Sequence, residues 1–281
     1  MKLPITAIIL TYNEERNIED GLKSIVDFID EIWIVDSYST DSTLDLVKKY
    51  TSNIVQHPFG NYSLQRNWAF NNLEIKNEWL LVMDSDHRMT PELKDLLIDK
   101  FSREIPSDLM GYMVSRKTMF MNKWIKHGGH YPTYHAALFR KGAGRCEEKN
   151  YDQHFIVTGR TEILKGDIID IITDSLTTFT TRHNTWATLE AEEAVRELSN
   201  EGALIKPDKN GNPIEQRRYM KMKYYRYPIF LRVAIYFIYR YIFKFGFLDG
   251  KEGLIFHVLQ GLWFRFLVDS KIYELNKNKI K

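Results

Sequence analysis

Residues 79–86 read Trp-Leu-Leu-Val-Met-Asp-Ser-Asp. The five apolar residues form a continuous run, which is typical of a β-strand buried on both faces of a sheet. Asp84 and Asp86 follow the run directly, and side chains two residues apart in extended backbone point to the same side. In an open parallel sheet, ligands bind just beyond the carboxyl ends of the strands. The stretch therefore predicts a buried strand that presents two carboxylates at a ligand-binding edge.

Strand and helix patterns alternate through the first hundred residues. Short apolar runs at residues 5–10, 32–35 and 53–56 predict further strands, and apolar residues at helical spacing between them predict helices. Thr90 before Pro91 marks the start of another helix, as N-cap and first helical residue. This alternation predicts an α/β fold in which a mostly parallel central sheet is flanked by helices.

The pattern is weaker beyond residue 105. We expect residues 152–157 and 159–165 to form a pair of strands. The clearest loop of the chain is Asp-Lys-Asn-Gly-Asn-Pro at residues 208–213, and we place a boundary there. The predicted organisation is a domain of residues 1–213 and a helical extension of residues 214–281.

The extension differs in charge from the rest of the 281-residue chain, whose net charge is +2. Residues 215–281 carry 14 lysines and arginines against 5 aspartates and glutamates, a net charge of +9, whereas residues 1–214 carry 25 against 32, a net charge of −7. Such asymmetry indicates an anionic partner for the basic part.

An apolar run at residues 228–248 lies within this extension and is interrupted by Arg232, Arg240 and Lys244, which fall on one face of a helix. The run is too charged for a standard membrane-spanning helix, so we expect helices that lie in the membrane interface with their basic face toward anionic headgroups. The alternative is an amphipathic pair packed on the protein's own core or on another subunit.

Polar clusters follow three of the predicted strands. Residues 11–14 read Thr-Tyr-Asn-Glu, residues 36–41 read Asp-Ser-Tyr-Ser-Thr-Asp, and residues 84–86 read Asp-Ser-Asp. Each is also typical of a turn, but three at one sheet edge indicate a binding site. The carboxylates Asp84 and Asp86 suit a hard divalent cation, Mg²⁺ or Mn²⁺, that shares its ligands with a substrate phosphate. A glycine-rich phosphate loop is absent from the sequence, so a dinucleotide fold and a P-loop are not supported.

These blocks, with Gln-Arg-Asn-Trp-Ala at residues 65–69, resemble the family 2 glycosyltransferases of the GT-A (Rossmann-like) fold. The resemblance is strong over about residues 3–100. It implies transfer of a sugar from a nucleotide sugar, here a UDP-hexose, with inversion at the anomeric carbon. It also implies that a nucleotide-sugar pocket is lined by Thr11, Tyr12, Asn13, Glu14, Asp36, Ser39, Arg66, Asp84, Ser85 and Asp86. Within that set Asp36 would bind the uracil and Arg66 would lie near the diphosphate. Asp84 would contact the ribose or the metal, and Asp86 would ligate the metal.

An inverting transfer needs a base that removes the proton of the acceptor hydroxyl. The family usually has an acidic residue for this in the second half of the domain, and here the corresponding residues 147–155 read Glu-Glu-Lys-Asn-Tyr-Asp-Gln-His-Phe. Asp152 is the first candidate and Glu148 the second, with surface solvation as the alternative for both. Gln153 stands where relatives often have a carboxylate.

Residues 152–155, 182–187 and 246–250 resemble a branch of the family that assembles bacterial lipopolysaccharide, capsule or exopolysaccharide. The Gln-x-x-Arg-Trp box of processive synthases is missing, which favours the transfer of a single sugar. His183 and Trp186 are candidates for contacts with the diphosphate or the acceptor, although a structural hydrogen bond accounts equally well for His183. His135 belongs to a histidine-containing loop that we expect near the acceptor, because no second Cys or His pair completes a zinc spacing.

The resemblance and the basic extension together predict an enzyme on the cytoplasmic side, held peripherally at the inner face of the cell membrane, whose acceptor is a lipid-linked or lipid-anchored saccharide. A signal peptide pattern is not present at the start of the sequence. The competing hypothesis is a catalytically decayed GT-A module that only binds nucleotide sugars or saccharides at the membrane. Nucleic-acid binding is disfavoured, because no nucleic-acid module is recognisable. The oligomeric state is open.

Overall fold

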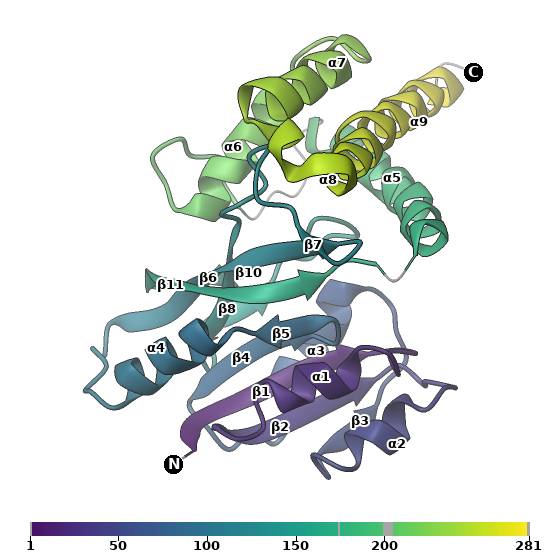
Figure 1. Cartoon of the computed structure of the whole chain (residues 1–281). Coiled ribbons are helices and arrows are strands. Elements are labelled where there is room, and N and C mark those ends of the chain that lie inside the picture. The colour runs from purple at the N-terminus through teal and green to yellow at the C-terminus, as the bar shows by residue number, and fades with distance from the viewer. Residues whose placement is uncertain (1, 174, 199–204, 280–281) are drawn as a thin grey trace. The chain divides into compact units, whose positions relative to one another are not determined.

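The computed structural model describes residues 2–173, 175–198 and 205–279 (Figure 1). The chain divides into two compact units. The first comprises residues 1–116, 133–148 and 153–170, and the second comprises residues 117–132, 149–152 and 171–281.

A mixed sheet runs through the first unit in the order β3-β2-β1-β4-β8-β6-β11-β5, while the last residues of β6 and the strand β7 that pairs with them belong to the second unit (Figure 1). Its strands are β1 (Leu3–Thr11), β2 (Ile29–Asp36), β3 (Ile54–Gln56), β4 (Trp79–Asp84), β5 (His87–Met89), β6 (Leu109–Phe120), β7 (Lys123–Trp124), β8 (Tyr134–Arg140) and β11 (Arg160–Ile171). The strands β3, β2, β1 and β4 are parallel to one another, whereas β8 is antiparallel to both β4 and β6. The predicted α/β fold is confirmed.

Both faces of the central parallel strands β1 and β4 are buried, as their continuous apolar runs predict. In β1, every residue from Ile5 to Thr11 is buried. Ile5, Ala7 and Ile9 share a core cluster with residues of the helices α1 (Ile18–Lys23) and α4 (Pro91–Phe101). The remaining helices of this unit are α2 (Thr43–Val47) and α3 (Tyr62–Asn72). The start of α4 is as predicted, because the Thr90 side chain accepts a hydrogen bond from the Leu93 amide.

The predicted pairing of residues 152–157 with residues 159–165 is wrong. The strand β10 (Phe155–Val157) pairs instead with β9 (Gly144–Cys146), and β11 lies between β6 and β5. The amide of Thr158 donates to the carbonyl of Ala143, which extends the contact between β10 and the β9 segment past the end of the strand. Closeness in sequence suggested a hairpin here, but strand 144–146 supplies the hydrogen-bond partners.

Helices make up most of the second unit: α5 (Leu176–Leu198), α6 (Pro213–Tyr225), α7 (Leu231–Ile238), α8 (Gly250–Phe256) and α9 (Phe264–Lys279). A π-helical turn follows α7 at Tyr239–Phe243, a 3-10 turn lies at Gly246–Asp249, and a second π-helical turn joins α8 to α9 at His257–Trp263. Small residues of α5, including Ala187 and Ala191, pack against Phe264 and Val268 of α9. The second unit therefore begins before residue 213 and includes α5 in addition to the predicted extension of residues 214–281. The boundary at residue 213 stays a prediction.

The expected orientation of the basic residues in the extension is wrong for two of the three. Arg232 and Arg240 are buried, and only Lys244 is exposed. The Arg232 guanidinium binds the buried carboxylate of Asp269 in α9, and Arg240 donates to the carbonyl of Gly128. A buried charge needs such partners, so both arginines face inward. No helix among the described residues is long and apolar enough to cross a membrane.

Candidate functional site

Three polar clusters meet at one edge of the sheet in the first unit. The parallel register sets Thr11 of β1 beside Asp36 of β2, and Leu10 of β1 beside Asp84 of β4. The carboxyl ends of three neighbouring strands are thus aligned. The structure brings together the clusters that the sequence predicts to lie at a ligand-binding edge.

Asp36 is fully buried at the end of β2. One carboxylate oxygen accepts from the Ser39 hydroxyl at 2.5 Å, and the other accepts from the Ser39 amide and from Gln56 Nε2, both at 3.0 Å. Three donors hold the carboxylate in one orientation. Gln56 is a part of this cluster that the sequence did not single out; its position at the end of β3, level with Asp36, is the signal that would have found it.

The loop after β1 is bound to the loop after β2. The Asn13 amide donates to Ser39 Oγ at 2.9 Å, and Asn13 Oδ1 accepts from the Thr40 amide at 2.8 Å. Asn13 has a φ of 52°, a conformation that asparagine tolerates better than most residues. The Glu14 amide donates to Thr43 Oγ1 at 2.8 Å. These bonds fix the loops, while the Tyr12 ring projects into solvent as an exposed flat surface.

Arg66 of α3 forms an ion pair with Asp84 at the end of β4. Its guanidinium is buried and lies 5.0 Å from the centre of the Phe155 ring. Burial alone would raise the pKa of Asp84, but the positive charges of Arg66 and Arg116 hold it well below its usual range. Asp84 therefore stays ionised at neutral pH.

Asp86 lies in the opposite electrostatic environment. Burial, and then the neighbouring carboxylates of Asp170, Asp84 and Glu14, raise its pKa well above the usual range. Burial also raises the pKa of Asp170. Several carboxyl groups thus lie close together. Arg116 is a nearby cation, whose guanidinium nitrogens lie 3.9 Å from a carboxylate oxygen of Asp84 and 3.9 Å from one of Asp170. Such a crowd of oxygen donors suits a hard divalent cation.

Asp170 and Arg116 belong to this site, although the sequence analysis missed both. Asp170 reaches it because β11 runs antiparallel to β5 and sets Asp170 opposite His87. Arg116 lies on β6, in the part of the chain beyond residue 105 where the sequence pattern is weak. Long-range antiparallel pairing leaves no local sequence signal, so neither residue was within reach of motif reasoning.

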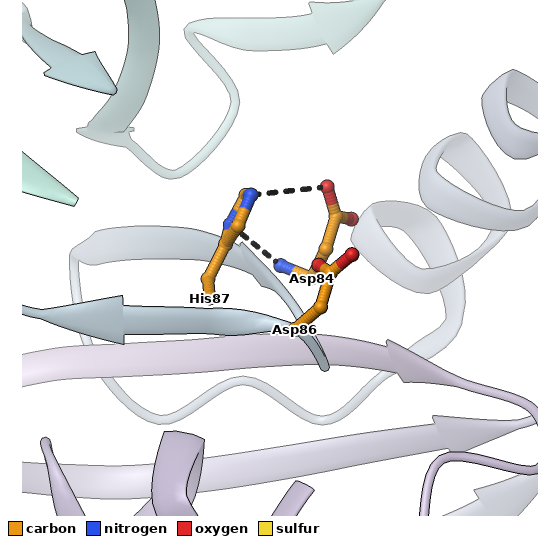
Figure 2. A group of neighbouring side chains, drawn as sticks. All are labelled: Asp84, Asp86 and His87. Atoms are coloured by element: carbon orange, nitrogen blue, oxygen red, sulfur yellow. Dashed lines mark hydrogen bonds and ion pairs between the residues drawn. The ribbon is translucent and has the colours of Figure 1, made fainter. Parts of the chain in front are cut away.

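His87 completes a group of three side chains with Asp84 and Asp86, whose ligand atoms lie within 4.8 Å of one another (Figure 2). Its Nδ1 accepts a hydrogen bond from the Asp84 amide at 3.0 Å, and its Nε2 faces Asp84 Oδ2 at 3.6 Å. Burial and the nearby Arg116 lower the pKa of His87 to about 3, so the ring is neutral. Since Nδ1 is the acceptor, the proton is on Nε2, and neither nitrogen has a lone pair left for a metal.

We therefore expect His87 to position Asp84 without binding metal. His87→Asn offers a carbonyl oxygen that can accept from the Asp84 amide in place of Nδ1, and Mn²⁺ affinity, measured by calorimetric titration, should change by less than about threefold. The small change is expected because asparagine keeps this support; losing the support of a metal ligand outright costs about 10–100-fold in affinity, and losing a ligand itself costs more. A weakening of about 10–100-fold in His87→Asn would show that asparagine does not replace this support, and a greater weakening would identify the imidazole as a ligand.

The other predicted residues of the sheet edge are also present. Ser85 is buried between the two aspartates, and its carbonyl accepts from the Arg88 side chain at 3.2 Å. The Thr11 hydroxyl and the Nε of Arg66 are buried, and neither has a hydrogen-bond partner among the described residues. A buried polar group without a partner is costly. A bound molecule that hydrogen-bonds to these two groups would remove that cost.

The candidate base residues fall in different compact units. Glu148 belongs to the first unit and is exposed. Asp152 belongs to the second, where Lys221 of α6 binds its carboxylate at 2.8 Å and lies 3.4 Å from the buried Glu190. Burial acts to lower the pKa of Lys221, but the two carboxylates raise it above its usual value. The lysine therefore remains a cation beside Asp152.

Three further residues were predicted near a diphosphate or an acceptor. His183 and Trp186 lie on α5. The His183 ring is buried, and its Nδ1 lies 2.8 Å from the Phe179 carbonyl oxygen. Because a carbonyl oxygen only accepts, Nδ1 is the donor of this hydrogen bond. This is the structural hydrogen bond that we weighed as the alternative. His135 lies on β8 and its ring stacks on His154 at 6.1 Å between centres. Their ligand contacts stay predictions.

The sheet order and the acidic edge define an α/β protein with a candidate ligand site at the carboxyl ends of its parallel strands, and comparison with known proteins gives the family. The model of glycosyl transferase family 2 matches residues 6–160, more than half of the chain. The chain belongs to that family.

Individual relatives show how far the similarity extends. A lipopolysaccharide core biosynthesis glycosyltransferase, LpsC of Rhizobium meliloti, is 24% identical over all of this chain and 96% of its own length. An uncharacterised glycosyltransferase of Rickettsia bellii is 30% identical over 118 residues, which are 42% of this chain. That match spans only 40% of the Rickettsia protein.

Among solved structures, the mannosyltransferase PcManGT of Pyrobaculum calidifontis, in complex with GDP-Man and Mn²⁺, matches 97% of this chain and 88% of its own chain. The TM-score is 0.55 and the sequence identity is 12%. This likeness shows the fold alone, which is that of a GT-A-like protein.

Proposed function

We propose that this protein transfers a single sugar from a nucleotide sugar, a UDP-hexose, to a saccharide acceptor, with inversion at the anomeric carbon. The observation that carries the proposal is the pair Asp84 and Asp86 at the end of β4, held beside Arg66 and level with the buried Asp36. Membership of glycosyl transferase family 2 supports the reaction class.

The fixed carboxylate of Asp36 would recognise the base, because it accepts hydrogen bonds and uracil offers a ring N–H. Its three internal bonds fix its direction before the nucleotide arrives, which reduces the ordering cost of binding. The exposed ring of Tyr12 offers a surface for stacking, and the unpaired Thr11 hydroxyl lies one strand away. The buried Nε of Arg66 would donate to the diphosphate.

A divalent cation, Mn²⁺ or Mg²⁺, fits the acidic group formed by Asp84 and Asp86, because the donors are carboxylate oxygens. When bound, it would neutralise the charge that develops on the departing nucleoside diphosphate. Asp84 is ionised and ready to act as a ligand, whereas Asp86 has to lose its proton first.

Asp152 is the proposed base, and Glu148 is the second candidate. We expect Asp152→Asn to lower kcat by about 100-fold or more, in line with the usual contribution of a positioned general base, while Glu148→Gln stays within about threefold. Steady-state rates of both amide variants decide between them. The two substitutions are matched in chemistry, so the reverse order would assign the role to Glu148, and equal rates in both would show that the base is another group.

The acceptor in this proposal is a lipid-linked or lipid-anchored saccharide of bacterial surface polysaccharide. The full-length similarity to LpsC, named for lipopolysaccharide core biosynthesis, supports this class. The protein would work at the inner face of the cell membrane, to which the extension of residues 214–281 would attach it peripherally. The excess of basic residues in the extension supports an anionic membrane surface as its partner.

The proposal is tested with membrane extract as acceptor source and a radiolabelled donor. Label that enters the lipid fraction only with active protein, one sugar per acceptor, is the expected result. If the protein binds nucleotide sugar in calorimetry but neither releases nucleotide nor transfers label, the molecule is a binding module and the proposal fails.

A further inference from the structure

The second unit exposes an apolar surface on and after α7. Leu231, Ile235, Ile238 and Ile242 are about half exposed and recur at i, i+4, i+7 and i+11, the spacing of one helix face. The chain then continues through exposed large side chains, which are Phe243, Phe245, Phe247 and Leu248. We call these eight residues the apolar face. Phe243, at 67% exposure, is the most exposed of them.

The amphipathic pattern of this segment is reversed relative to an ordinary surface helix, which buries its apolar side and exposes its charges. Arg232 is 3% exposed and its partner Asp269 is fully buried. Arg240 donates through Nε to the Gly128 carbonyl at 2.6 Å and through Nη1 to the Tyr236 hydroxyl at 2.9 Å. With both arginines held inside, Lys244 is the one exposed charge in the fully described stretch 227–248.

Exposed cations, and no exposed acids, flank the apolar face in sequence. The exposed side chains Lys223, Arg226, Lys244 and Lys251 border it in sequence. Between residues 216 and 273 the acids are three: Asp249 and Asp269 are buried, and Glu252 is partly buried and lies 3.5 Å from Lys123. Exposed apolar surface with a cationic border matches a lipid layer with anionic headgroups.

We propose that the apolar face inserts into the acyl boundary of one leaflet of an anionic bilayer, with the bordering lysines and Arg226 at the headgroups. The inference rests on the proposed function, which takes an anionic membrane as partner. It differs in how the protein binds that membrane, because insertion of apolar side chains, and not a basic helix face, supplies most of the binding. A second copy of the chain fits less well, since a symmetric contact would set each cationic border against its own counterpart.

Vesicle co-flotation of the full-length protein tests this surface. The vesicles are phosphatidylcholine with and without phosphatidylglycerol, each at low and at high salt. Because apolar burial is insensitive to screening, wild type should stay bound to anionic vesicles at high salt. Burial of one large apolar side chain is worth about tenfold or more in partitioning, so Phe243→Ser/Leu248→Ser should weaken binding by about 100-fold.

The matched control is Ile98→Ser/Ile163→Ser, which removes two exposed apolar side chains of the first unit and should leave binding unchanged. Release of wild type by salt, or undiminished binding of Phe243→Ser/Leu248→Ser, would overturn the inference. Failure of wild type to float with the vesicles would also overturn it. In that case, a wild-type dimer in sedimentation velocity that is absent in Phe243→Ser/Leu248→Ser would identify a second copy of the chain as the partner of this surface. Nucleotide release by the same preparations without lipid reports separately on the proposed function.

Discussion

Asp86→Asn should lower metal-dependent turnover by about 1,000-fold or more while leaving the metal-free protein at least as stable as wild type. The substitution removes a carboxylate ligand, so the divalent cation can no longer be held between Asp84 and Asp86. Burial and the neighbouring carboxylates raise the pKa of Asp86 and so favour the neutral acid in the metal-free site. Asparagine has nearly the same shape as that neutral acid and cannot take on the unfavourable charge.

Two measurements separate these effects. Initial rates over a Mn²⁺ titration report turnover, and thermal unfolding in EDTA reports stability. Asp95→Asn is the control, because Asp95 is an exposed aspartate of α4 away from the site, and both readouts should stay at wild-type values. Full activity in Asp86→Asn would show that this carboxylate is not a metal ligand. A large loss of thermal stability in EDTA would show that Asp86 supports the fold as an ion.

Asp269→Asn should lower the free energy of unfolding by about 3–5 kcal/mol, because it leaves the guanidinium of Arg232 buried without a countercharge. Both side chains are buried, and Arg232 Nε lies 2.9 Å from Asp269 Oδ1 and 3.1 Å from Oδ2. The carboxylate also accepts from the Phe230 amide at 2.8 Å. The pair joins the start of α7 to α9 within the second unit.

Urea unfolding of three variants measures this pair. Arg232→Met/Asp269→Asn removes both charges and keeps an acceptor for the Phe230 amide, so it should recover most of the loss. Asp45→Asn breaks the exposed pair Lys48–Asp45 and should cost less than about 1 kcal/mol. If Asp269→Asn costs no more than Asp45→Asn, the buried pair does not hold α7 to α9.

The fold of the first hundred residues could be predicted from the sequence because the patterns that indicate their strands and helices are local. A continuous apolar run such as Ile5–Leu10 reports a strand buried on both faces, and Thr90 with Pro91 reports a helix start. Parallel strands with the same direction place their carboxyl ends together, so the neighbourhood of Asp36 and Asp84 also followed from the pattern.

The structure of the second half was harder to predict from the sequence because it depends on contacts between residues far apart in the chain. Asp170 lies opposite His87, 83 positions earlier in the chain, through a strand pairing that has no local motif. The strand at 144–146, which takes the place we expected for residues 159–165, is only three residues long. Helical periodicity predicted Arg232 and Arg240 on one face, but it could not show whether these side chains are buried. That depends on Asp269 and on the Gly128 carbonyl.

The most direct test of the central claim is release of nucleoside diphosphate from a panel of nucleotide sugars in the presence of Mn²⁺, Mg²⁺ or EDTA. The panel contains UDP-glucose, UDP-galactose, their N-acetyl forms and GDP-mannose, with membrane extract as the acceptor source. We predict release from one UDP-hexose that requires a divalent cation and is lost in Asp86→Asn. Release that is undiminished in EDTA, or no release from any donor together with no nucleotide binding, would contradict the account.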